Sequence, residues 1–128
     1  MATHTLTVTH TTNDGGTVSN SITETGTAYL EIAESVADSE TDYEIVCAID
    51  VSEIALLYIV SDQDVTLETN SGSEAVDTLA LEANEPVTWT TKSIYDCPLT
   101  EDVTSVFITN ASGAAANVKM RVLTDATP

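Results

Sequence analysis

Basic side chains are nearly absent from this sequence. Lys92, Lys119 and Arg121 stand against 21 Asp and Glu residues in 128, which gives a formal net charge of −18. Proteins that bind DNA or RNA neutralise phosphates with clustered lysine and arginine, and attraction to anionic membrane surfaces depends on the same residues. The composition therefore argues against nucleic acids and membranes as partners. Two overlapping interpretations of the acidity remain: solubility with repulsion between copies, and an outward-facing coat that does not adhere to nucleic acid.

Long apolar runs are missing as well. No segment approaches the roughly 20 apolar residues that cross a bilayer. The N-terminus carries no basic region followed by an apolar stretch, the pattern of a secretory signal peptide. We therefore expect a chain that folds in a cytoplasm. Its length predicts one domain with a core of its own.

Cysteines are limited to Cys47 and Cys97. They form no CxxC pair, so the sequence offers no recognisable thiolate metal site. Cys47 lies in the apolar stretch "YEIVCAI" and is expected to act as a small buried apolar residue. A disulfide between the two cysteines is the less favoured alternative, because cytoplasmic proteins rarely keep one.

Groupings of residues that carry catalysis are missing too. No serine lies in a G-x-S-x-G elbow, no glycine loop resembles a phosphate cradle, and no pair of carboxylates is singled out. The two histidines, His4 and His10, are a poor supply of general bases and lie roughly 20 Å apart along a strand, too far to share a metal ion. We expect no enzymatic activity, no cofactor and no metal centre.

Acidic residues alternate with hydroxyl residues in one short run. "DSETDYE" (38–44) places Asp38, Glu40 and Asp42 at alternate positions with hydroxyl residues between them. Ca²⁺ takes six to eight oxygen ligands, but this run lacks the glycine and the terminal glutamate of an EF-hand loop. A solvated acidic loop is the favoured interpretation, and weak calcium binding stays open.

Threonine, valine and isoleucine in alternating patterns dominate what is present. They predict an all-β fold, an antiparallel β-sandwich (jelly-roll-like) of about 8–10 short strands. We predict short helical turns at 50–54 and 99–103, and a tight hairpin turn at "NDGG" (13–16). The predicted strands are 3–10, 17–24, 27–34, 43–50, 55–61, 64–69, 77–82, 86–91, 104–109 and 117–123.

Alternation also predicts which residues face the core. They are Leu30, Ile32, Ile45, Cys47, Ile49, Leu57, Ile59, Val65, Leu67, Leu79, Leu81, Val106, Ile108, Val118, Met120 and Val122. Two segments, 53–68 and 102–121, can be aligned so that Leu57, Tyr58 and Ile59 match Val106, Phe107 and Ile108. We predict that each segment is a hairpin with one apolar row facing the core.

The first twelve residues, "MATHTLTVTHTT", place threonines on one face of a strand and a thin apolar line on the other. Two interpretations follow: residues 1–12 form the first strand of a hairpin with 17–24, which is favoured, or an N-terminal arm that adds to the sheet of a neighbour. Residues 13–128 are expected to form the sandwich. The candidate partner-binding residues are His4, Leu6, Val8 and His10.

Aromatic residues are few, six in all. Trp89 in "PVTWTT" and Tyr95 nearby offer a weak candidate for stacking a sugar ring. A tryptophan packed at the rim of a sheet is the favoured interpretation of Trp89.

The region from about 50 to 123 resembles a group of small bacteriophage virion proteins with a β-sandwich body. The resemblance is carried by "LLYIVSDQDVTLETNSG", "DTLALEANEPVTW" and "CPLTEDVTSVFITNASGAAANVKMRVL". It implies a non-enzymatic structural protein of the virion, made in the host cytoplasm, that decorates and stabilises the capsid exterior. The implied partners are the major capsid protein and further copies of this chain. A tail or fibre-base component, or a glycan-binding surface module, is the alternative.

Overall fold

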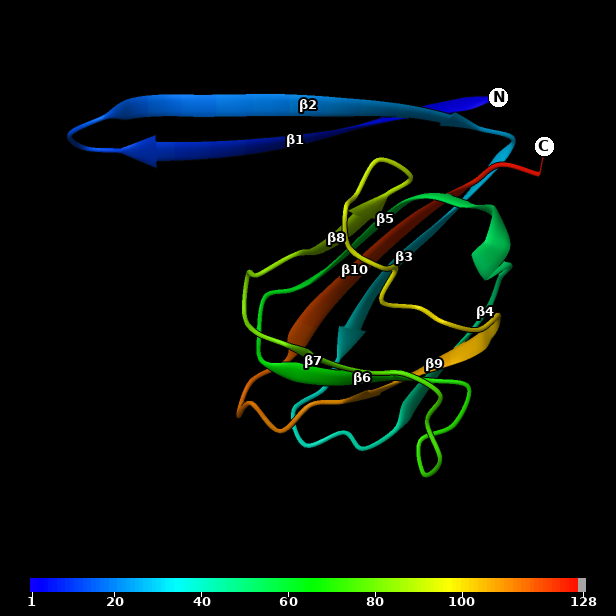
Figure 1. The fold of residues 1–128 in the computed structure, drawn as a ribbon. Coiled ribbons are helices and arrows are strands. Elements are labelled where there is room, and N and C mark those ends of the chain that lie inside the picture. Colours follow the sequence, from blue (N-terminus) through cyan, green and yellow to red (C-terminus); the bar gives the residue numbers. More distant parts are fainter. Residues whose placement is uncertain (127–128) are drawn as a thin grey trace.

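Ten strands and one short 3-10 turn make up the computed structural model, which describes residues 1–126 (Figure 1). Each strand lies within two residues of its predicted position, because β-branched residues alternate with polar ones along nearly all of them. The strands are β1 (Ala2–Thr12), β2 (Gly16–Gly26), β3 (Ala28–Val36), β4 (Tyr43–Ile49), β5 (Ile54–Ser61), β6 (Val65–Thr69), β7 (Thr78–Leu81), β8 (Val87–Thr90), β9 (Val103–Thr109) and β10 (Ala116–Thr124).

Strands β3 to β10 form two four-stranded antiparallel sheets that face each other. One sheet has the order β3-β10-β5-β8 and the other β4-β9-β6-β7. Counted from β3 as the first strand, these orders are 1-8-3-6 and 2-7-4-5, which is the strand order of a jelly roll. The predicted β-sandwich is confirmed, and the chain alternates between its two sheets as a jelly roll does.

The core lies between these two sheets. All sixteen residues predicted to face inward belong to it or pack against it. The core also contains residues that alternation did not identify, among them Val36, Ile54, Leu99, Val103 and Ala116. Leu57, Leu67 and Ile108 have no exposed surface, and burying side chains of this size contributes about 1.5–3 kcal/mol each.

The two similar segments do not form hairpins, and that prediction is wrong. β5 and β6 lie in opposite sheets, as do β9 and β10, so each segment is an arch across the core. The match itself has a structural counterpart: Ile59 pairs with Met120 between β5 and β10, and Ile108 pairs with Leu67 between β9 and β6. Because the same alignment matches Leu67 with Met120, equivalent residues make equivalent pairs in the two sheets.

The two predicted helical turns have different outcomes. Residues 50–54 contain the 3-10 turn η1 (Val51–Glu53), whose start is capped by Asp50, because its carboxylate accepts a hydrogen bond from the Ser52 N–H at 3.0 Å. Residues 99–103 form no helical turn, so that prediction is wrong. Within residues 1–126, no helix is long and apolar enough to cross a membrane.

Strands β1 and β2 form a separate two-stranded sheet that lies across one end of the sandwich and extends well beyond it (Figure 1). We call residues 2–26 the hairpin. Residues 1–12 therefore pair with the segment that follows them. The sandwich begins at Ala28, since residues 13–26, expected within it, belong to the hairpin.

Candidate functional site

The hairpin is built by a tight turn and a continuous register. β1 and β2 pair from Ala2 with Gly26 to Thr12 with Gly16. The Thr12 hydroxyl accepts a hydrogen bond from the Gly15 N–H at 2.7 Å. Gly16 adopts φ +88°, a left-handed conformation that glycine reaches without steric cost. Eleven residues per strand give a ribbon about 35 Å long.

One face of the hairpin carries a ladder of hydroxyl groups. Side-chain oxygens of directly opposed Thr and Ser residues lie 2.9–3.2 Å apart in four successive cross-strand pairs. Such pairs contribute roughly 0.2–1 kcal/mol each and hold the register of a ribbon that buries little apolar surface. The pairs are Thr5–Thr23, Thr7–Ser21, Thr9–Ser19 and Thr11–Thr17.

The base of the opposite face is seated on the sandwich. Ala2 and Leu6 pack against a small second core on the outer face of the β3-β10-β5-β8 sheet, formed by Ala55, Leu56 and Leu123. We call this contact the seat of the hairpin. It covers the first part of the apolar line of β1 with residues of the chain's own sandwich.

Two polar and aromatic contacts complete the seat. His4 meets Tyr29 in an edge-to-face ring contact, with centroids 5.5 Å apart and ring planes at 62°. Glu24 on β2 accepts from the Thr91 hydroxyl at 2.7 Å and from Lys92 Nζ at 3.0 Å. The Glu24 side chain is only 12% exposed, so this ion pair is more shielded than an ordinary surface pair.

Gly26 fixes where the hairpin leaves the body. A Cβ atom at this position would lie 2.4 Å from the Thr124 carbonyl oxygen, so any larger residue forces the two backbones apart. The next residue, Thr27, donates its N–H to the same carbonyl at 2.9 Å. The hairpin and the end of β10 are thus joined at close backbone approach.

Beyond the seat, the hairpin extends free of the sandwich. We call residues 8–20 the distal hairpin. Val8 is 60% and Val18 63% exposed, and both lie on the face that continues the seated line of Leu6. Among the described residues, no hydrogen bond or ion pair joins the distal hairpin to the sandwich. Of the four predicted partner-binding residues, His4 and Leu6 contact the chain's own body, whereas Val8 and His10 stay exposed.

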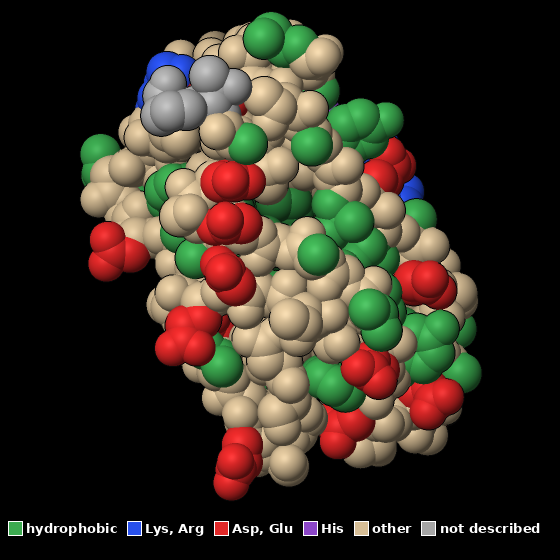
Figure 2. All heavy atoms as spheres, turned by 90° about the vertical axis from the view of Figure 1, so that its right-hand side faces the viewer, with side chains coloured by type: hydrophobic (Ala, Val, Ile, Leu, Met, Phe, Trp, Pro, Cys, Tyr) green, Lys and Arg blue, Asp and Glu red, His purple; other side chains and the backbone are tan. Residues whose placement is uncertain are grey.

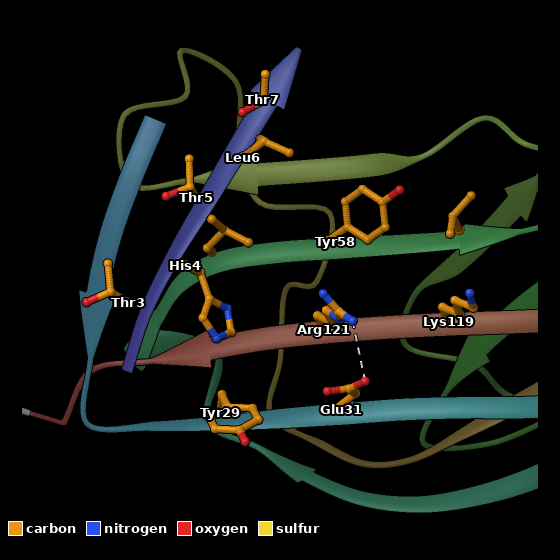
Figure 3. A pocket seen from close by; sticks show the side chains of 12 residues that line it. Thr3, His4, Thr5, Leu6, Thr7, Tyr29, Glu31, Tyr58, Lys119 and Arg121 are labelled. Carbon is orange, nitrogen blue, oxygen red and sulfur yellow. Dashed lines mark hydrogen bonds and ion pairs between the residues drawn. The ribbon is translucent and has the colours of Figure 1, made fainter. Parts of the chain in front are cut away.

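A groove of about 780 Å³ lies where β1 crosses the outer face of the β3-β10-β5-β8 sheet. Figure 3 shows His4 and Leu6 pointing from β1 toward the sheet, while Tyr58, Arg121 and Lys119 stand on the strands below. The volume falls in the usual range of ligand sites, about 300–1,000 Å³. We call this the hairpin groove. It is lined by Thr3, His4, Thr5, Leu6, Thr7, Tyr29, Glu31, Leu56, Tyr58, Val60, Lys119 and Arg121.

The hairpin groove holds two of the few positive charges on this acidic surface, together with the carboxylate of Glu31. Two of the three basic residues of the whole chain, Lys119 and Arg121, line it. On the face drawn in Figure 2, acidic side chains are spread widely and basic ones occupy only small spots at the margin. This groove is not among the sites expected from the sequence, although the alternation in "VKMRV" places both cations on one face of a strand.

Beside the groove, Asp62 carries a perturbed carboxyl group. It accepts hydrogen bonds from the backbone N–H of Asn117 at 2.7 Å and from its side-chain amide at 2.8 Å. These bonds favour the charged form and lower the pKa of Asp62 below its ordinary value. The exposed carboxylate thereby links the β5–β6 connection to the start of β10.

The residues considered for sugar binding are engaged within the chain. Trp89 packs against the core, and its indole Nε1–H donates to the Tyr95 carbonyl at 2.8 Å. The Tyr95 hydroxyl donates to the Thr88 carbonyl at 3.1 Å. Trp89 therefore lies half-buried on an edge strand of its sheet, whereas the Tyr95 side chain is 56% exposed.

The acidic loop and the cysteines show no assembled centre. Within residues 1–126, no three His, Cys, Asp or Glu side chains gather as a metal site would require. Asp38 instead accepts from the Gly113 N–H at 3.0 Å, and Asp42 from the Thr109 hydroxyl at 3.4 Å. Cys47 and Cys97 are both free thiols. Burial raises the pKa of each, and the Asp77 charge adds to the rise for Cys97 while a hydrogen bond from Leu99 opposes it.

Comparison with protein-family models, with curated proteins and with solved structures returned no match. Function is therefore inferred from the residues and the fold of this chain.

Proposed function

We propose that this protein is a non-enzymatic structural component of a bacteriophage particle that binds the exterior of the capsid and stabilises the shell. It is made in the host cytoplasm and assembles on the particle beside further copies of itself. Its partners are the major capsid protein and those copies. No step of this role requires a cofactor or turnover.

The observation that carries the proposal is the distal hairpin. A two-stranded ribbon is marginally stable by itself in water, yet this one extends past its own body with Val8 and Val18 exposed. A ribbon of this kind gains stability when another protein covers its apolar face or pairs with its edges. We therefore assign the distal hairpin as the segment that docks on the capsid subunit.

Two properties of the body support the same role. The jelly roll is a fold of viral capsid proteins, although it serves other functions too. The net charge of −18 keeps the chain from the packaged nucleic acid and from self-association in solution. Many copies, each adding a modest interface, would stabilise a shell through mass action and multivalency.

Co-sedimentation of the purified protein with undecorated capsids of the encoding phage tests the proposal. We expect saturable, stoichiometric binding and a higher melting temperature of the decorated shell. Absence from the shell, with the protein found on tails or in the unbound fraction, would overturn the capsid assignment. Density at the tail would favour a tail or fibre-base component.

A further inference from the structure

Strand β1 has a free edge, and that edge faces the hairpin groove. Thr3 through Thr7 are five consecutive β1 residues that line the groove, whereas no β2 residue lines it. Within residues 1–126, β1 pairs only with β2. The backbone N–H and C=O groups on the other side of β1 therefore point toward the groove. An unpaired edge of this kind is a template for an added strand.

The floor of the groove is suited to the side chains of such a strand. Leu56, Tyr58 and Val60 alternate along β5 on the outer face of the sheet and line the groove. A strand added beside β1 would turn every second side chain toward the outer face of the sheet, on which this apolar row lies. It would also widen the hairpin from two strands to three over a partly apolar surface, and such sheets are independently stable.

Two cations on the same floor define the charge of the partner. Lys119 and Arg121 are two residues apart on β10, so their side chains lie on one face about 7 Å apart. Among the described residues, the Arg121 guanidinium pairs only with Glu31, at 3.5 Å, and both side chains are at least half exposed. This pair is therefore weak. In the described part of the chain Lys119 makes no ion pair within 4.0 Å, although its charge interacts with the Asp62 carboxylate nearby.

We propose that the hairpin groove binds an extended acidic segment of another protein, which adds to β1 as a strand and places carboxylates on Arg121 and Lys119. Arginine pairs with carboxylates through two parallel hydrogen bonds, which gives geometric as well as charge selectivity. The inference concerns the groove rather than the distal hairpin, and it does not depend on the capsid role.

A second copy of this chain fits the groove less well than a foreign segment. Its acidic run at 38–44 is held in its own fold, since Ser39 and Glu40 exchange backbone hydrogen bonds of 2.8 Å with Asn110. Ser39 and Asp42 also have positive φ values, so the run is not an extended strand. We therefore assign the groove to a different protein.

Peptide titration of the full-length protein, followed by NMR of its backbone amides, tests the inference. The probe is a blocked seven-residue peptide that alternates glutamate with valine or threonine. Controls are the same peptide with lysine in place of glutamate, and versions N-methylated at alternate amides. We expect the glutamate peptide to shift the amides of Thr3, Thr5 and Thr7, and one N-methylated version to lose binding.

Substitution of the two cations sharpens the test. The double variant Lys119→Gln/Arg121→Gln should bind the glutamate peptide at least tenfold more weakly while its melting temperature changes little. The charge-reversed variant Lys119→Glu/Arg121→Glu should prefer the lysine peptide. Four results would overturn the inference: no binding at about 1 mM peptide, equal binding of the lysine peptide to the wild type, shifts mapped away from β1, or a wild-type dimer that the double variant abolishes. Capsid co-sedimentation is a separate experiment, so a failure of peptide binding at the groove would leave the proposed capsid role untouched.

Discussion

The Nζ atom of Lys92 lies 3.0 Å from Oε1 of Glu24, which joins the loop after β8 to strand β2 of the hairpin. It is one of two ion pairs among the described residues, and the other, Arg121 with Glu31, is longer and more exposed. The hairpin is therefore held by charge as well as by the seat of Leu6.

Substitution Lys92→Met should loosen the base of the hairpin. Exposed ion pairs contribute roughly 0.2–1 kcal/mol to stability. Because the Glu24 side chain is largely shielded from water, we expect this pair to contribute about 1 kcal/mol, the upper end of that range. Urea unfolding and hydrogen exchange of the β2 amides would measure the loss. Arg121→Met is the matched control and should cost less than half as much. Equal costs for the two variants would contradict a specific role for the Lys92–Glu24 pair.

Leu6→Ala and Val8→Ala should differ sharply although the two residues are neighbours on one face of β1. Leu6 packs on the second core, whereas Val8 is 60% exposed. Since Leu6 is only partly buried, we expect a cost of about 1–2 kcal/mol, below the 2–5 kcal/mol of fully buried leucines. Val8→Ala should stay within about 0.5 kcal/mol. Hydrogen exchange of the β1 and β2 amides would measure both costs. A larger cost for Val8→Ala than for Leu6→Ala would contradict the packing of Leu6 on the sandwich.

Asn110 should tolerate no replacement. It is fully buried, and its amide Nδ2 lies 2.8–3.2 Å from the carbonyls of Val36, Ala37 and Ala114. The substitution Asn110→Asp keeps the shape but turns a donor into an acceptor against those carbonyls. Leaving buried carbonyls unpaired costs about 1–3 kcal/mol each, so the melting temperature of both Asn110→Asp and Asn110→Ala should fall markedly. If Asn110→Asp left the melting temperature unchanged, the amide donor would not be needed at this position.

Asp62 should make part of the stability depend on acid pH. Hydrogen bonds from Asn117 hold the pKa of Asp62 below its ordinary value in the folded state. Its contribution is therefore complete above the unfolded pKa and is lost as the pH falls through the folded pKa. In thermal melts between about pH 6 and pH 2, the melting temperature of Asp62→Asn should fall less with decreasing pH than that of the wild type. Asp14→Asn removes one charge from the hairpin turn and serves as the control; identical behaviour of the two variants would refute the assignment.

Much of the fold could be predicted because its strands are short, alternate cleanly and end at Gly or Asn turns. Residues such as Ile45, Leu67 and Met120 follow period-two alternation, so their burial was predicted. Leu99 lies outside any strand, so no alternation marks it. Val36 continues the alternation of Leu30 and Ile32, but it lies beyond the predicted end of that strand at residue 34. The pattern at 53–68 and 102–121 predicts hairpins rather than arches, because alternation within strands does not reveal which sheet each strand joins.

The site was predicted in part. The apolar line of His4, Leu6, Val8 and His10 indicated a contact face, and the structure divides it into a seated base and an exposed distal end. The partner of the base could not be foreseen, because Leu56 and Leu123 lie more than 45 positions away along the chain and become an apolar patch only when β5 pairs with β10. The hairpin groove depends on the same long-range arrangement.

Cryo-electron microscopy of capsids incubated with the wild type and with a short-hairpin variant tests the central proposal most directly. Thr7 and Ser21 are cross-strand partners, so residues 8–20 can be replaced by an Asn-Gly turn without disturbing the seated base. The variant should melt within a few degrees of the wild type. We predict stoichiometric wild-type density on the shell exterior, with the distal hairpin against a capsid subunit, and shells left bare by the variant. Equal occupancy by both proteins, or wild-type density in which the distal hairpin touches nothing, would contradict the proposal.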